Sequence, residues 1–501
     1  MGAVVTPAGL GTPAPPADGQ VADKGLRRGA IGFISSVVIG VASTAPGYSL
    51  AATLGLIVAA VGFQAPAVLW VAFIPMLCIA SAYLYMNRTD PDCGTTFAWV
   101  TKAMGPWAGW LGGWAIIVAD IVVMANLAQI AGLYSFTLFG WDSAAGSTAA
   151  VTAVGVLWIV VMTAITTIGI ELSARTQWYL LGAEVVTLVL FAVVALVRVY
   201  AGDASPAAAH PQLAWFSPFA IDGGTAALTT GVLLAVFIYW GWDSAVSVNE
   251  ETEDPAESPG RSAVVSTILL VGIYVLVATA AVAFAGTHAL AGKDDALSIL
   301  GTDVLGNTFD SLLIIAVLTS AAASTQTTIL PTARTTLSMA RAGAMPAGLG
   351  VVHPRYMTPH VATVLFGALS IVWYVGLTIV SQNILLDSIA ALGLMIAFYY
   401  GLTGFACALY YRRAVRGSPK GLLFAVVAPV VGGAILAWVL VKSIIDLSDP
   451  ANSTSGSWLG VGPPLVIGVG FMLLGAVLMV VWSRNDRAFF RRRPEVFGST
   501  E

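Results

Sequence analysis

The chain has few of the residues on which soluble enzymes depend. Of its 501 residues only 10% are charged, and it holds just four histidines and three cysteines. Its formal charge of −4 says little about partners, because the charges fall in short loops, and we expect no nucleic-acid partner. The spacing of Cys78, Cys93 and Cys407 fits neither a disulfide framework nor a zinc site. We therefore expect no metal and no cofactor.

Motifs for catalysis and for ATP binding are missing as well. The sequence holds no HExxH, no GxSxG and no P-loop pattern, and no histidine converges with an aspartate inside an apolar run. An enzyme and an ATP-driven pump are both disfavoured. We predict that the protein is not an enzyme.

Hydrophobic residues make up 58% of the chain, and they form long runs. About twelve runs are long enough to cross roughly 30 Å of hydrocarbon as helices, which predicts an all-α integral membrane protein. The second and third runs are joined by a half-polar segment, 87–105. The runs lie near 30–58, 65–87, 107–139, 148–169, 177–200, 226–250, 262–286, 311–340, 361–380, 384–411, 421–446 and 461–483.

The ends and loops hold little beyond these runs. Residues 1–28 are predicted to be a disordered cytoplasmic tail, and 484–501 a basic cytoplasmic tail. The largest outer loops, 201–225 and 287–310, are too short to fold independently. With both termini inside, only three of the 22 lysines and arginines lie on the outer side, which indicates a cell-membrane protein with cytoplasmic ends.

The stretch Leu233–Pro255 begins as an apolar, membrane-spanning run, but its apolar character is then interrupted. At residues 239–243, YWGWD, it places aromatics, a glycine and a carboxylate near the middle of the membrane, and it ends in an acidic segment before Pro255. A charge at that depth costs about 3 kcal/mol on insertion scales, so it usually faces a cavity or a partner. A helix broken there leaves backbone groups free, which is tolerated where they line a site.

The first run has a matching interruption. Ser43–Gly47, with Pro46 inside it, removes a backbone donor and permits non-helical dihedral angles. Because the two breaks lie five helices apart, we predict a 5+5 inverted repeat. The ten-helix core would cover 29–411, with repeats at about 29–200 and 226–411 and two further helices at 420–483.

Broken helices offer complementary binding groups. The N-terminus of a half-helix suits a carboxylate, and the carbonyl groups at the end of the preceding half suit an ammonium group. A zwitterion or an amine satisfies both. The alternative is that Pro46 only kinks a packed helix.

Three motifs resemble the amino acid–polyamine–organocation superfamily of permeases. The family's helix 6 signature is resembled by Gly241-Trp242-Asp243 followed by 250–255, EETEDP. The loop after its helix 8 is resembled by 338–346, SMARAGAMP, with Thr358-Pro359. The segment before its helix 3 is resembled by 91–97, PDCGTTF. The resemblance covers about 30–485. It implies the fold shared with the sodium symporters, with discontinuous helices 1 and 6.

The resemblance also implies where substrate binds. Its carboxylate would meet the backbone of Thr44–Gly47, its ammonium the carbonyls near Phe237–Trp240, and Phe237 would close over it, with Trp240 and Trp242 as alternatives. Thr44-Ala45-Pro46 replaces the family's usual G-S-G-like break, so the anion contact is looser or the substrate is not a standard α-amino acid. The full predicted binding set is Ser43, Thr44, Ala45, Pro46, Gly47, Phe237, Ile238, Tyr239, Trp240, Gly241 and Gln129.

A second set is predicted to serve coupling and gating: Asp243, Glu184, Ser320, Ser324 and Thr325. Asp243 matches a family position linked to proton sensing; it could instead bind the distal amine of a cationic substrate or make a structural hydrogen bond. Glu184 stands where some sodium-independent relatives have a lysine. Ser320 and Ser324 share a helix face near the sodium ligands of coupled relatives, although such hydroxyls often bond their own backbone.

Two polar groups are left without a settled role. Asp120 needs a partner that the sequence does not reveal, and the acidic segment 250–257 either pairs with arginines such as Arg334, Arg341 and Arg355 or is solvated.

Taken together, the sequence predicts a permease that moves an amino acid or related amine by alternating access. Coupling to protons is favoured over coupling to sodium. A polyamine permease, an exchanger and a non-transporting sensor are the alternatives, and the oligomeric state is open.

Overall fold

The computed structural model describes residues 23–292, 296–306, 311–380, 383–414, 418–453, 455–495 and 497. Of the predicted N-terminal tail 1–28, only 23–28 belong to this part, and Lys24 and Leu26 are buried there. Of the predicted C-terminal tail 484–501, Arg487–Phe490 forms the short helix α19, in which Phe489 and Phe490 are buried. Residues 1–22, 496 and 498–501 lie outside the described residues.

The described chain is all helical and has no β-sheet, which confirms the predicted fold class. Ten of its helical stretches are long and apolar enough to cross a membrane. The main helices, including the shorter α1, α2 and α9 that flank the interruptions, are α1 (Phe33–Ser43), α2 (Pro46–Val61), α3 (Ala65–Thr89), α5 (Pro106–Thr137), α7 (Thr148–Ile168), α8 (Ile170–Ala201), α9 (Gly224–Ile238), α11 (Ser258–Leu290), α13 (Ser311–Arg341), α14 (His360–Val380), α15 (Asn383–Tyr411), α17 (Ala428–Leu447) and α18 (Pro463–Asn485).

Shorter helices fill the connections. The half-polar segment before α5 contains α4 (Thr96–Met104). The connection 287–310, expected to be an outer loop, contains α12 (Ala296–Leu305), which packs on α2 and α8. This segment is too short to cross a membrane, but it forms a helix that buries apolar side chains such as Leu297 and Leu300.

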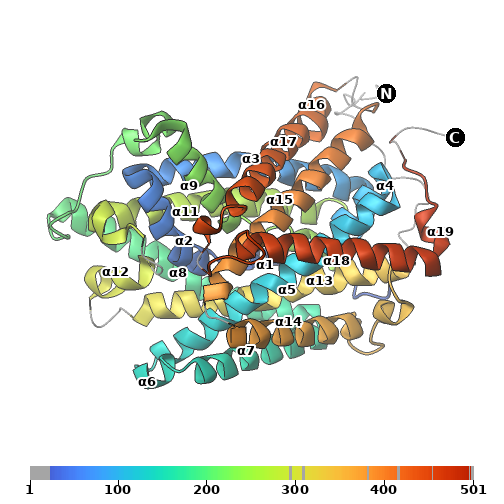
Figure 1. Cartoon of the computed structure of the whole chain (residues 1–501), viewed down its shortest axis with the longest axis horizontal. Coiled ribbons are helices and arrows are strands. Elements are labelled where there is room, and N and C mark those ends of the chain that lie inside the picture. Colours follow the sequence, from blue (N-terminus) through green and yellow to red (C-terminus); the bar gives the residue numbers. More distant parts are fainter. Residues whose placement is uncertain are drawn as a thin grey trace, which may run out of the picture.

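The helices differ in how much lipid-facing surface they carry. Most of α5 and α13 is buried, and these two helices pack along each other, whereas only about a third or less of the most apolar part of α7, α14, α17 and α18 is fully buried. In Figure 1, α1 lies near the centre of the bundle and α7 and α14 lie together at its lower edge. The short helix α1 contacts α8, α10 (Ser244–Ser247), α11 and α13, so the first break is enclosed by the bundle.

Candidate functional site

Helix 1 is broken where the sequence predicts. Helix α1 ends at Ser43 and α2 begins at Pro46. Between them Ala45 has left-handed backbone angles (φ 47°, ψ 64°), which are unusual for a residue other than glycine. Pro46 is suited to the first turn of α2, because that position needs no N–H donor.

Helix 6 is broken as well. Helix α9 ends at Ile238, and the chain turns through 239–243 before the short helices α10 and η4 (Asn249–Glu251). The two breaks touch. At Gly241 (φ 118°) an added Cβ would lie 2.7 Å from the carbonyl oxygen of Ser43, so only glycine fits. The hydroxyl groups of Ser43 and Ser244 lie 2.8 Å apart.

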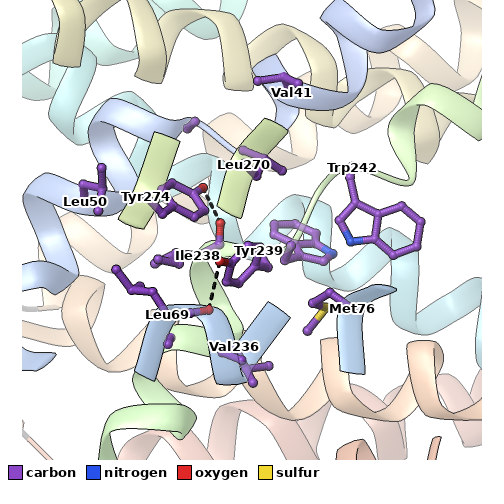
Figure 2. Packing of buried hydrophobic residues seen from close by; sticks show 14 of the residues in the cluster. Val41, Leu50, Leu69, Met76, Val236, Ile238, Tyr239, Trp242, Leu270 and Tyr274 are labelled. Atoms are coloured by element: carbon purple, nitrogen blue, oxygen red, sulfur yellow. Dashed lines mark hydrogen bonds between the residues drawn. The ribbon is translucent and has the colours of Figure 1, made fainter. Parts of the chain in front are cut away.

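Side chains already occupy part of the predicted ammonium site at the end of α9. The Ile238 carbonyl accepts a hydrogen bond from Tyr274 Oη at 2.5 Å, and Tyr239 Oη donates to the Leu69 carbonyl at 2.9 Å; both bonds are drawn in Figure 2. The Phe237 carbonyl accepts the Trp240 N–H at 3.0 Å. The Phe237 side chain is half-buried. The end of α9 is thus tied firmly to α3 and α11.

Glu184 on α8 lies against the helix 1 break. Its side chain is fully buried, and its Oε1 accepts the backbone N–H of Gly47 at 2.7 Å. The adjacent Tyr48 N–H donates to Ser320 Oγ on α13 at 3.1 Å. These N–H groups open α2, where the helix dipole favours negative charge. The other oxygen of Glu184, Oε2, has no hydrogen-bond partner among the described residues.

The remaining backbone N–H groups of the helix 1 break also donate hydrogen bonds within the protein. The N–H groups of Thr44 and Ala45 donate to the carbonyls of Val41 and Ala42 at 3.2 and 3.1 Å, and Pro46 has no N–H. Every donor in the segment predicted to hold the substrate carboxylate therefore has a protein partner in this conformation. At Gly47 that partner is itself a carboxylate.

Two of the three predicted helix 8 hydroxyls reach the break. Ser320 accepts the Tyr48 N–H, and Ser324 Oγ donates to the Ser43 carbonyl at 2.9 Å. Thr325 does not, because its hydroxyl donates to Ala321 in its own helix at 2.8 Å. Ser320, Ser324 and Glu184 thus join α13 and α8 to the broken helix.

Asp243 lies within a cluster of tyrosines that sequence reasoning missed. Tyr400 Oη donates to Oδ1 at 2.8 Å and Tyr399 Oη to Oδ2 at 3.1 Å, while Trp240 Nε1 donates to Tyr399 Oη at 2.5 Å. The ring of Tyr83 packs edge-on against Trp242 and Tyr400. Adjacent tyrosines in an otherwise apolar helix were the available signal, since a buried phenol needs a polar partner.

Two polar groups on α5 point to different partners. Asp120, whose partner was unknown from the sequence, accepts a hydrogen bond from Thr332 Oγ1 on α13 at 2.6 Å. Gln129, predicted to reach the substrate, instead accepts one from Tyr374 Oη on the outer helix α14 at 2.7 Å. This conformation therefore brings Gln129 to α14 and not to the breaks.

One end of the bundle is closed by buried ion pairs. Arg334 on α13 donates two hydrogen bonds to the Glu251 carboxylate, of 2.6 and 2.9 Å, and neither side chain is exposed to solvent. The N–H groups of Ala30 and Ile31 donate to the Glu251 carbonyl, and the Glu253 N–H donates to the Ile31 carbonyl. Of the two interpretations of the acidic segment, pairing with an arginine holds for Glu251, whose partner is Arg334.

A second contact at this end is made by Lys24, whose role the sequence did not indicate. Its Nζ lies 2.6 Å from Glu250 Oε1, 2.8 Å from Asp92 Oδ2 and 3.6 Å from Cys93 Sγ. Asp92, Cys93 and Glu250 are residue types that can bind a metal ion, but the ammonium group of Lys24 lies between their side chains. Burial would raise the pKa of Asp92, but the charge of Lys24 and the hydrogen bonds from Lys24, Ser338 and Gly94 together outweigh it and hold the pKa below its usual value.

A bundle of long apolar helices in which two broken helices meet is typical of membrane transporters. The sequence model of the family described as amino acid permease matches residues 28–483. The chain therefore belongs to the amino acid permease family, as its motifs suggested, and it is a multi-pass membrane transporter.

Similar proteins agree with this assignment. An uncharacterized transporter of Mycobacterium tuberculosis is 29% identical over 68% of this chain and 72% of its own length. The branched-chain amino acid permease BcaP of Lactococcus lactis is 24% identical over 55% of this chain and 61% of its own length. Asc-type amino acid transporter 1 of Mus musculus is 23% identical over 78% of this chain and 69% of its own length.

Proposed function

We propose that this permease takes up an amino acid or a related amine across the cell membrane by alternating access, driven by proton entry. The family, and relatives named for amino acid transport, support an amino acid substrate. The two touching breaks support a binding site between α1 and α9, because the backbone groups of half-helices suit a zwitterion.

The observation that carries the proposal is the bond between the Glu184 carboxylate and the Gly47 N–H. A charged acceptor makes a stronger hydrogen bond than a neutral one, so ionised Glu184 holds the start of α2 against α8. Protonation at Oε2, which has no hydrogen-bond partner among the residues that the structure describes, weakens that hold and frees the break to move or to accept the substrate carboxylate.

Asp243 supplies a second carboxylate for coupling. It belongs to the break in helix 6, while its tyrosine partners belong to α15. A change in its protonation would alter the contact between these two elements. A cationic amine is the second candidate substrate, because Asp243 and Asp120 are buried and no basic side chain is among the partners that the structure gives them.

The end closed by Arg334 and Lys24 is assigned to the cytoplasm. Arg334 and Lys24 belong to the segments that the positive-inside rule predicts to be cytoplasmic, where most lysines and arginines of the sequence fall. The conformation is then one in which the inner gate is shut by Arg334–Glu251 and by Lys24. Uptake requires these pairs to part.

Transport by reconstituted protein tests the proposal. Liposomes with an inward proton gradient receive labelled amino acids and amines, and wild type is compared with Glu184→Gln, Asp243→Asn and Glu171→Gln. Glu171 is the matched control, since it lies on the same helix but is exposed and paired with Arg27 at 3.0 Å. We expect the proton gradient to stimulate uptake by the wild type and by Glu171→Gln. Glu184→Gln should lose this stimulation but still bind substrate.

Three other outcomes would contradict parts of the proposal. Uptake that needs substrate inside the vesicles and ignores pH would make the protein an exchanger. Binding without flux would make it a sensor. Full proton dependence in both Glu184→Gln and Asp243→Asn would remove these carboxylates from coupling.

A further inference from the structure

A groove on the outside of the bundle is separate from the breaks. It has a volume of about 630 Å³ and lies between the segment that leads into α1 and the start of α8, at the end closed by Lys24. Both helices begin here, so the groove lies at the level where the membrane-spanning segments start. Its lining residues are Ala30, Ile31, Ser35, Glu171, Ala174, Arg175, Trp178 and Tyr179.

The groove carries one uncompensated positive charge. Glu171 is paired with Arg27 at 3.0 Å. Arg175 is exposed, and no carboxylate within the described ranges lies close enough to pair with it. A guanidinium group in such a place offers several N–H donors to an anion, and it matches the geometry of a phosphate.

Aromatic side chains flank this arginine. Trp178 and Tyr179 are 48% and 76% exposed, and Trp178 Nε1 donates to Ser35 Oγ at 3.2 Å. Tryptophan and tyrosine are enriched where a membrane helix meets the headgroups of the bilayer. The groove thus combines a free basic group with rings suited to the membrane interface.

An exposed apolar stripe continues from the groove along α8. Val186, Val193 and Tyr200 follow Tyr179 at intervals of seven residues, which places them on one face of the helix, and all are strongly exposed. The stripe therefore runs from the groove into the depth of the membrane. A ligand with an anionic head and a long apolar tail fits both parts.

We propose that this groove is a binding site for an anionic phospholipid, whose phosphate contacts Arg175 while its acyl chains follow the exposed face of α8. Basic pockets between membrane helices are suited to such headgroups. The lipid would touch both α8 and the segment that leads into α1. Helix α1 is the half-helix that ends at the first break. Bound lipid would then favour the arrangement of α1 seen here.

Thermal unfolding of the purified full chain in non-ionic detergent tests the site without measuring transport. Dioctanoyl phosphatidylglycerol is titrated, with dioctanoyl phosphatidylcholine and inorganic phosphate as the other two probes. A ligand that binds the folded state raises the unfolding midpoint in a saturable way. The variants are Arg175→Gln, Arg175→Lys and Arg355→Gln, the last being an exposed arginine of the same end that does not line the groove.

We expect saturable stabilisation by phosphatidylglycerol alone. Arg175→Gln should weaken apparent binding by roughly fivefold or more, Arg175→Lys by less, and Arg355→Gln should match wild type. Equal stabilisation by phosphatidylcholine, or an unchanged response in Arg175→Gln, would overturn the proposal. Stabilisation by inorganic phosphate to the same extent would show a free-anion site instead of a lipid site. Since no flux is measured, failure here leaves the proposed transport function untouched.

Discussion

Arg334 and Glu251 form a doubly hydrogen-bonded ion pair in which neither side chain is exposed to solvent. The pair joins α13 to the acidic segment that follows the helix 6 break. Taking both charges out of water is costly, so the pair gives little net stability, but losing one partner leaves the other charged and buried. The two single changes and the double change should therefore behave very differently.

We predict that Arg334→Gln lowers the free energy of unfolding by about 3–5 kcal/mol, because Glu251 is then left without its partner. The double variant with Glu251→Gln should recover much of that loss, since no buried charge remains. Thermal unfolding in detergent measures Arg334→Gln, Glu251→Gln and the double variant, with Arg355→Gln as an exposed control. A double variant as unstable as the sum of its single changes would show that the pair has no such coupling.

The second prediction concerns Lys24, which covers Cys93 from the N-terminal side. In a background with Cys78→Ala and Cys407→Ala, the buried thiol of Cys93 reports whether this end of the bundle opens. Lys24→Met removes the cation between Asp92 and Glu250, so the two carboxylates repel and the N-terminal segment separates. We expect the maleimide labelling rate of Cys93 in detergent to rise roughly tenfold or more.

The matched control for Lys24 is Arg27→Met, because Arg27 lies in the same segment but forms an exposed pair with Glu171. Exposed pairs contribute about 0–1 kcal/mol, so this change should hardly alter labelling. Equal labelling rates in Lys24→Met and wild type would mean that other contacts, such as those of Ala30 and Ile31 with Glu251, hold this end closed.

Helix positions could be predicted from the sequence because each membrane span is a long apolar run. The predicted runs 148–169 and 311–340 correspond to Thr148–Ile168 and Ser311–Arg341. The breaks could be predicted as well, since Pro46 lacks a donor and Gly241 permits a conformation that other residues avoid. These are local properties of the chain.

Partners across the bundle could not be predicted in the same way. Helix α5 is apolar on almost all sides, so its sequence does not tell which face meets which neighbour, and the contact of Gln129 with Tyr374 on α14 could not be foreseen. The contacts of Asp243 with Tyr399 and Tyr400, and of Lys24 with Asp92, join segments that are distant in sequence. Such pairings depend on how helices rotate and pack.

The third prediction is that Gly241→Ala separates the two breaks. The added Cβ would lie 2.7 Å from the Ser43 carbonyl oxygen, and the φ of 118° is itself unfavourable for alanine. The Ser43–Ser244 contact would be lost as the backbones move apart. Since the proposed substrate site is made by both breaks, we expect uptake to fall by roughly a hundredfold, with a loss of about 2–3 kcal/mol in stability.

Gly182→Ala is the control for this change, because an added Cβ on that α8 residue meets nothing within 4 Å and alanine favours a helix. Uptake into liposomes and unfolding in detergent are measured for both variants. If Gly241→Ala lost stability but kept its uptake, the contact between the breaks would serve folding alone. If it kept both, the close approach of Gly241 to Ser43 would not be needed at any stage of transport, and a binding site built from the two breaks would have to be abandoned.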